Sequence, residues 1–180
     1  MRTFYYFLIG ILLFYIDTII GLTIPMHFGK IDIIFVPHLT IMYILIMTVY
    51  RGFGVAMSLA FFFGIVTDLY FGSIYGLYMF GYIILVVIVD KFFKIFYRDY
   101  SVLFFIILLS TMFLEVYVAM IYGVIGFIEF NLIEFVLLRL IPTLIINFLL
   151  LIMLFPIIIK FTKKVKNTID SKSRHIQVTI

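Results

Sequence analysis

The stretch "FFFGIVTDLYFGSIYGLYMFGY", which covers residues 61–82, contains one carboxylate, Asp68, in an otherwise almost wholly apolar run. Gly64 and Gly72 lie four residues before and after this aspartate, and Gly76 lies four residues further on. Because residues four apart share a helix face, Gly64 and Asp68 form a narrow strip on which a second helix can approach closely. The stretch therefore predicts two membrane helices joined by a tight hairpin between Gly72 and Gly76, with Asp68 buried under their contact.

The composition of the whole chain is typical of a membrane protein. Of its 180 residues, 66% are hydrophobic and 12% are charged, whereas soluble domains are about half apolar and a quarter charged. The chain has no cysteine, which excludes disulfides and thiolate metal sites. The apolar run after Arg2 resembles a signal peptide, but its length, the Asp17 within it and the lack of a small-residue cleavage site predict a retained helix.

Six apolar segments are long enough to cross a bilayer, which takes about 20 residues of helix. The short links between them contain turn residues, as in "PMHFGKID", "YRGFG" and "FGSIYG". Short links predict antiparallel neighbours, so we expect an all-α, six-helix transmembrane bundle. The predicted spans are Phe4–Ile24, Ile33–Tyr50, Phe53–Phe71, Ile74–Phe96, Val102–Gly126 and Leu132–Ile159.

The basic residues predict the orientation of the chain. Six spans place all 13 lysines and arginines on one side of the membrane, except Lys30 in an opposite loop and Arg139 inside the sixth span. Lysine and arginine accumulate on the cytoplasmic side, so both termini are expected in the cytoplasm. We divide the chain into a transmembrane domain, residues 1–160, and a basic cytoplasmic tail, residues 161–180. The tail is either a topology anchor or a segment that binds anionic lipid headgroups.

Four ionisable residues fall inside the predicted spans: Asp17, Asp68, Glu115 and Arg139. A charge at the bilayer centre costs on the order of 3 kcal/mol, so such residues normally face protein or a water-filled cavity. A rise of about 1.5 Å per residue places Asp17 and Arg139 each about 10 Å below the outer surface. Their matching depth and opposite charge predict an ion pair between them. Glu115 lies near the midplane.

The remaining carboxylates have several alternatives. They are protonated, bonded to the backbone or to hydroxyl groups such as Thr67, Ser110 and Thr111, or exposed to water in a cavity. One interpretation of the four charges is a polar pocket that opens outward and favours a cationic solute. The other is a set of clamps between helices with no ligand. His38, at the outer start of the second span, is either a helix cap or a binding residue.

The sequence lacks the patterns of common catalytic sites. A Ser-His-Asp set, a phosphate-binding Walker loop and an HExxH pattern are all missing, and three widely spaced histidines do not make a metal site. We therefore expect a protein that is not an enzyme, with no catalytic residue, cofactor, metal or nucleic-acid partner.

Several short motifs between Ile34 and Tyr82 resemble the MreD family, the membrane component of the bacterial rod-shape system. The family pattern has a Pro-polar-Leu opening to the second span, a glycine-containing turn, a third helix ending in Gly-x-x-x-Asp-x-x-x-Gly, and further glycines downstream. Here these motifs are "VPHL" at Val36–Leu39, "YRGFG" at Tyr50–Gly54, "GIVTDLYFG" at Gly64–Gly72, Gly76, and Gly81-Tyr82. Chain length, span count and the basic tail are also similar to the family.

This resemblance implies a non-enzymatic role in cell-wall elongation and cell shape at the bacterial cytoplasmic membrane. It implies a partner, the bitopic protein MreC, within an assembly that includes actin-like MreB and the peptidoglycan polymerases. It also implies a bundle similar to the substrate-binding component of energy-coupling-factor transporters. In the family pattern Asp68 fixes the third and fourth helices, and the expected packing or partner contacts are Gly64, Gly72, Gly76 and Gly81.

Other functions stay open at this stage. The runner-up is a small-solute-binding component of a transporter, although the first span, "FLIGILLFYIDTIIG", lacks the Ala-x-x-x-Ala docking face of such components. A lipid-binding subunit is the third alternative. The sequence also leaves open whether the chain forms a homodimer.

Overall fold

A computed structural model describes residues 2–23, 27–28, 31–95, 100–127 and 131–178. Nearly all of these residues are helical. The elements, in chain order, are α1 (Arg2–Thr23), β1 (His27–Phe28), β2 (Ile31–Asp32), α2 (Leu39–Arg51), α3 (Phe53–Phe71), α4 (Leu77–Ile95), α5 (Tyr100–Ile125), α6 (Leu132–Phe135), the π-helical turn η1 (Val136–Leu140) and α7 (Ile141–Val178). The two-residue strands β1 and β2 pair as a small antiparallel hairpin.

The six predicted spans correspond to six helical segments, the last of which is α6, η1 and α7 in direct succession. Within the described residues, four segments are long and apolar enough to cross a membrane: Phe4–Thr23, Phe53–Phe71, Ser101–Ile125 and Leu132–Phe161. The helix α2 is apolar but shorter, and α4 carries three charged residues near its C-terminal end. The prediction of an all-α bundle with six helices is therefore confirmed.

The second helix begins later than predicted. It starts at Leu39, and residues 33–38, which were expected to be its first turns, are not helical. Pro37 explains the difference, because proline disfavours the helical conformation in the residue before it and donates no backbone hydrogen bond. At the other end of the chain, the backbone of α7 continues as a helix past residue 160 to Val178. The division into a domain and a tail stays a prediction.

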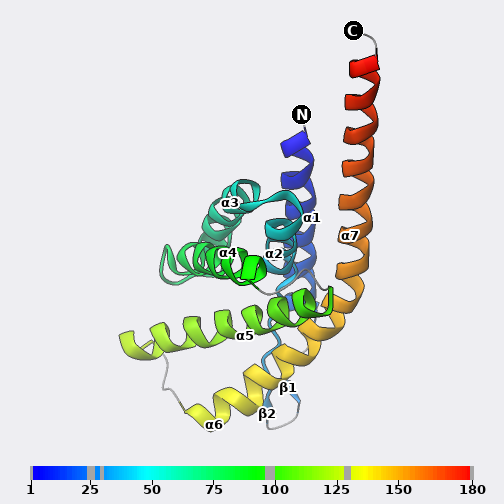
Figure 1. Cartoon of the computed structure of the whole chain (residues 1–180). Coiled ribbons are helices and arrows are strands. Elements are labelled where there is room, and N and C mark those ends of the chain that lie inside the picture. The colour runs from blue at the N-terminus through cyan, green and yellow to red at the C-terminus, as the bar shows by residue number, and fades with distance from the viewer. Residues whose placement is uncertain (1, 24–26, 29–30, 96–99, 128–130, 179–180) are drawn as a thin grey trace.

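The helix α2 is the centre of the bundle. Every residue from Leu39 to Thr48 is buried, and α2 contacts α1, α3, α4, α5 and α7. A helix that is apolar on all sides lies either in a protein core or in lipid, and α2 lies in the core. The start of α1 and the end of α7 lie at the same end of the molecule, and α5 crosses α1 steeply (Figure 1). The bundle is therefore not a simple array of antiparallel helices.

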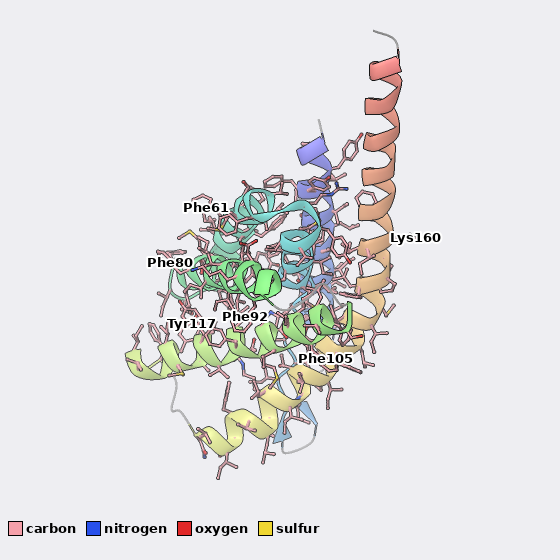
Figure 2. The ribbon with its side chains drawn as sticks, viewed as in Figure 1. Phe61, Phe80, Phe92, Phe105, Tyr117 and Lys160 are labelled. Carbon is pink, nitrogen blue, oxygen red and sulfur yellow. The ribbon has the colours of Figure 1, made fainter. Side chains whose placement is uncertain are left out.

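The outside of the bundle is apolar. Figure 2 shows Phe61 and Phe80 on the outer faces of α3 and α4, and their side chains are 53% and 57% exposed. Rings in such positions would meet lipid tails in a bilayer. The buried polar and charged side chains are held inside the bundle, where they form the site described below.

Gly64 allows the backbones of α3 and α4 to approach each other closely in the hairpin. A Cβ atom added to Gly64 would lie 2.5 Å from the Cα atom of Met79 on α4, a distance that no side chain tolerates. Gly76 has a φ of +94° in the turn before α4, which favours glycine. Gly72 donates its N–H to the carbonyl of Asp68 at the end of α3. Gly81 faces Leu114, so it packs α4 against α5.

Candidate functional site

The site begins at the extended segment that precedes α2. Backbone N–H and C=O groups inside a bilayer must be bonded within the protein, so non-helical segments occur there only against other protein or at a cavity. The N–H of Ile34 donates to the carbonyl oxygen of Leu138 in η1 at 2.8 Å. Pro142 lies four residues after Leu138 and has no N–H to donate to that carbonyl. Because Pro142 cannot donate to it, the carbonyl oxygen of Leu138 is available to accept the N–H of Ile34 in the extended segment.

Two buried side chains of α7 bind the rest of this segment. The side-chain amide of Asn147 donates to the carbonyl of Val36, and its oxygen accepts the N–H of His38, both at 2.8 Å. The hydroxyl of Thr143 accepts the N–H of Val36 at 3.2 Å. Asn147 is completely buried. Asn147 thus supplies hydrogen bonds to backbone groups of Val36 and His38, which lie outside a helix.

Asp17 binds the start of α2. Its two carboxylate oxygens accept the backbone N–H groups of Leu39 and Thr40 at 2.8 Å, and one of them also accepts the Thr40 hydroxyl at 2.7 Å. The first N–H groups of a helix have no partner within the helix, and the helix dipole favours a negative charge there. An aspartate of α1 therefore caps α2 from a distance of 22 residues along the chain.

Asp68 has the same role for α4. It is buried, and its oxygens accept the N–H groups of Tyr78 at 2.8 Å and Met79 at 3.0 Å. The sequence had predicted a carboxylate beneath a close helix contact, and a helix cap is a second role that a carboxylate at a helix end can take. The structure combines them, because Asp68 caps the following helix while the Gly64 contact covers it.

Glu115 connects three elements. One of its oxygens lies 2.8 Å from Nε2 of His38, and the other accepts Nε of Arg139 at 2.7 Å. Glu115 and His38 are 1% and 5% exposed, whereas Arg139 is 27% exposed. An ionised carboxylate only accepts hydrogen bonds, so with Glu115 ionised against Arg139 the tautomer of His38 that fits is the one with its proton on Nε2. This arrangement joins α5, η1 and the residue before α2, and it gives a buried carboxylate a cationic partner.

The predicted ion pair between Asp17 and Arg139 is wrong. Arg139 binds Glu115, and Asp17 binds the first turn of α2. The two residues line the same cavity, but an estimate of depth contains no information on which side of its helix a residue faces.

The hydroxyl groups suggested as partners for the carboxylates have other acceptors. Those of Thr67, Ser110 and Thr111 donate to backbone carbonyls of their own helices. His38 stands at the N-terminal cap position of α2, but its ring binds Glu115 and does not cap the helix.

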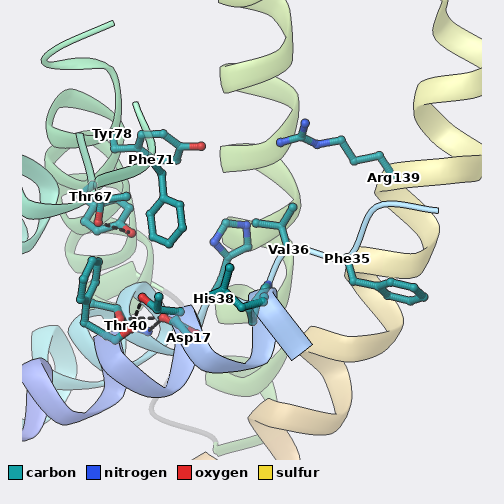
Figure 3. A pocket seen from close by; sticks show the side chains of 15 residues that line it. Asp17, Phe35, Val36, His38, Thr40, Thr67, Phe71, Tyr78 and Arg139 are labelled. Atoms are coloured by element: carbon teal, nitrogen blue, oxygen red, sulfur yellow. Dashed lines mark hydrogen bonds between the residues drawn. The ribbon is translucent and has the colours of Figure 1, made fainter. Parts of the chain in front are cut away.

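These groups surround a cavity of about 350 Å³. Its polar lining includes Asp17, His38, Tyr78 and Arg139, and apolar walls come from α1, α3 and the extended segment (Figure 3). A volume of this order lies at the lower end of the range for small-molecule sites. Within the described part of the chain, no group of three His, Cys, Asp or Glu side chains could hold a metal ion.

Sequence reasoning missed Thr40, Tyr78, Thr143 and Asn147 in this site. Asn147 carried a usable signal, because a lone amide in the apolar run "NFLLLIMLF" must find partners inside a bilayer. Its partners are backbone atoms of residues more than one hundred positions away, and they could not be named without the fold.

The helices, the internal clamps and the apolar exterior define a multi-pass membrane protein whose buried charges hold its helices in place. The sequence pattern of the family described as rod shape-determining protein MreD matches residues 1–165. The chain therefore belongs to the MreD family and is a rod-shape-determining protein of the bacterial inner membrane. Searches of curated proteins and of solved structures gave no match. The likeness to energy-coupling-factor components accordingly stays a prediction.

Proposed function

We propose that this protein is a membrane scaffold of the cell-wall elongation machinery, and that it binds MreC and helps to organise peptidoglycan synthesis. The observation that carries the proposal is the family match over residues 1–165. In this proposal both termini are cytoplasmic, and the tail after residue 160 contacts anionic headgroups. MreB and the peptidoglycan polymerases belong to the wider assembly.

The internal bonding supports a scaffold. Asp17 ties α1 to α2, Asp68 ties α3 to α4, and Glu115 ties α5 to η1 and to the start of α2. None of these charged groups belongs to a catalytic arrangement of nucleophile and base, and each one fixes the position of a helix end. A rigid set of helices is what a partner needs in order to recognise one surface.

In this proposal, the single membrane helix of MreC binds in a groove between α1 and α3. The groove measures about 230 Å³, and Ile11, Tyr15, Phe62 and Tyr70 are among the residues that line it. These side chains are 40–63% exposed. Helices associate in lipid through close packing, since lipid tails are as apolar as the side chains. A groove that receives the side chains of a second helix increases that packing.

The test is recovery of MreC with tagged protein from gently solubilised membranes. Tyr15→Ala removes a ring from the groove, and Tyr5→Ala removes a ring of similar exposure from the same helix outside the groove. We expect Tyr15→Ala to lower recovery about fivefold, which corresponds to about 1 kcal/mol, and Tyr5→Ala to leave it unchanged. Equal recovery with both variants would reject the groove, and failure of the unmodified protein to recover MreC would reject the scaffold.

The cavity gives the transporter alternative its one supporting observation. A solute-binding component should copurify with an ATPase module instead of wall-synthesis proteins. The same pull-down therefore distinguishes the two functions, because the proteins recovered belong to different machineries.

A further inference from the structure

The cavity beside α2 presents hydrogen-bond donors to whatever enters it. Arg139 binds Glu115 through Nε, which leaves the two terminal nitrogens at the other end of the guanidinium. Figure 3 shows this end pointing across the cavity in the direction of the Tyr78 hydroxyl. Both residues line the cavity. A guanidinium carries five N–H donors and no acceptor, so its open end suits an anionic oxygen.

The carboxylates near the cavity are already engaged. Both oxygens of Asp17 accept hydrogen bonds from the first turn of α2, where the helix dipole balances the charge. Both oxygens of Glu115 are bonded to His38 and Arg139, and Glu115 is not part of the lining. A cationic solute, as the sequence had suggested, would find its potential partners occupied, whereas an anion would find donors.

The remaining walls are mostly apolar, with hydroxyl groups of Thr18, Thr67 and Tyr82 among them, and the cavity is not fully enclosed. Phe14 on α1 and Phe71 on α3 supply apolar wall area, together with Leu22 near the end of α1. Leu22 is 78% exposed and Phe71 is 51% exposed, so these two lining side chains extend from the cavity to the outside of the bundle. A ligand with a charged head and an apolar body can place its head inside and leave the rest of its length in the bilayer.

We propose that this cavity is a binding site for an acidic amphiphile, which places a phosphate or carboxylate head against Arg139 and Tyr78 and an apolar chain against Phe14 and Phe71. This ligand site goes beyond the scaffold function and does not depend on the partner. The same head chemistry could come from a membrane lipid or from a soluble phosphate ester, and we assign it to a lipid because the walls are mostly apolar and the cavity is not fully enclosed.

Two substitutions test the site without disturbing its internal clamps. Tyr78→Phe removes one hydroxyl and keeps the ring and the backbone N–H that binds Asp68. Gly21→Leu fills the cavity from α1, where a Cβ atom would meet only Pro37 at 3.9 Å, an ordinary contact. Leucine also favours a helix more than glycine does, so this variant should fold.

Each substitution has a matched control. Tyr75→Phe removes a hydroxyl from an exposed residue that lines neither this cavity nor the α1–α3 groove. Gly54→Leu introduces the same side chain on α3, where a Cβ atom would have no neighbour within 4 Å. Thermal unfolding in detergent verifies that all four variants fold before ligand binding is compared.

Native mass spectrometry of the purified full chain measures binding of three probes. They are phosphatidylglycerol, phosphatidylcholine with identical chains, and glycerol 1-phosphate. We expect phosphatidylglycerol to bind about tenfold more tightly than either of the others. The quaternary ammonium of phosphatidylcholine offsets its phosphate charge beside the guanidinium, and glycerol 1-phosphate has no apolar chain for the walls. Tyr78→Phe and Gly21→Leu should reduce this preference at least about threefold, and the two controls should retain it.

Three results would overturn the proposal. Equal binding of the two lipids would show that the cavity does not recognise the charge of the head group. A preference for phosphatidylglycerol that survives both Tyr78→Phe and Gly21→Leu would place the lipid elsewhere on the surface. Binding of glycerol 1-phosphate as tight as that of the lipid would assign the cavity to a soluble anion and reject the amphiphile.

Discussion

Asp17 and Asp68 do the same chemical work in two different surroundings. Each carboxylate accepts the first N–H groups of the next helix. Asp68 lies ten residues from the helix it caps, under a contact that Gly64 closes. Asp17 lies 22 residues from its helix, beside an extended segment and a cavity. One region is local and closed, and the other is assembled from distant segments and stays open.

This difference relates to function. A closed hairpin holds two helices at a fixed distance, which suits a structural element. A site built from α1, the extended segment, η1 and α7 has room for a ligand, because non-helical backbone in a membrane tends to line a cavity. We therefore expect substitutions in the hairpin to act on folding, and substitutions at the cavity to act on both folding and binding.

The largest expected effect is at Glu115. Glu115→Leu leaves Arg139 and His38 without their shared acceptor, and breaking a buried pair costs about 3–5 kcal/mol in soluble proteins. We expect a strong loss of protein level and of thermal stability in detergent. The double variant Glu115→Leu with Arg139→Leu should regain part of this loss, because it leaves no buried unpaired charge. A mild effect of the single variant would contradict the central role of Glu115.

The earlier idea of an Asp17–Arg139 pair makes an opposite prediction that the same assay checks. Exchanging the two residues, Asp17→Arg with Arg139→Asp, should not restore stability, because the structure gives them different partners. Recovery in the exchanged protein would mean that the two residues bind each other after all.

The next effect is at Gly64. Gly64→Leu must separate α3 from α4, because the new Cβ atom would overlap the backbone at Met79. Overpacking typically costs about 1–3 kcal/mol and more where backbone must move. Ile84→Phe is the control, since this side chain is 41% exposed on the outer face of α4. We expect lower thermal stability and lower recovery of MreC for Gly64→Leu only. Similar behaviour of both variants would show that the contact is not needed.

A smaller effect separates the two aspartates. An asparagine keeps one acceptor oxygen and turns an N–H₂ group toward the second backbone donor, so either substitution should cost about 1–2 kcal/mol, as for other caps. Asp17→Asn should be the more harmful, because Asp17 accepts three hydrogen bonds and Asp68 accepts two. Thermal unfolding of the two variants side by side measures the difference, and the reverse order would reject this account.

The smallest perturbation tests the topology of the chain. The absence of cysteine provides a clean background for single-cysteine labelling. We expect a cysteine at Asn131 to react with an impermeant reagent added from outside, and a cysteine at Ser101 or Ser171 to be shielded. External labelling at Ser171 would contradict the proposed cytoplasmic C-terminus.

The sequence by itself determined the class of protein, the number of helices and the α3–α4 contact. The length and composition of an apolar segment decide whether it is helical in lipid. The spacing of Gly64, Asp68 and Gly72 is visible in the sequence of one helix, so it needs no knowledge of the rest of the fold. The short motifs that resemble the family are equally local, since they lie within one third of the chain.

Only the tertiary structure decided which polar groups meet. The partners of Asn147, Glu115 and Asp17 depend on how helices rotate about their axes and where α2 begins, and neither quantity follows from depth in the membrane. Pro37 delays the start of α2, and Pro142 cannot donate to the carbonyl of Leu138, which accepts the N–H of Ile34 in the resulting extended segment. The effects of the two prolines therefore depend on each other. Their combination is non-local because Pro37 lies in the extended segment before α2 and Pro142 lies on α7, and only the packing of the bundle brings these two segments together.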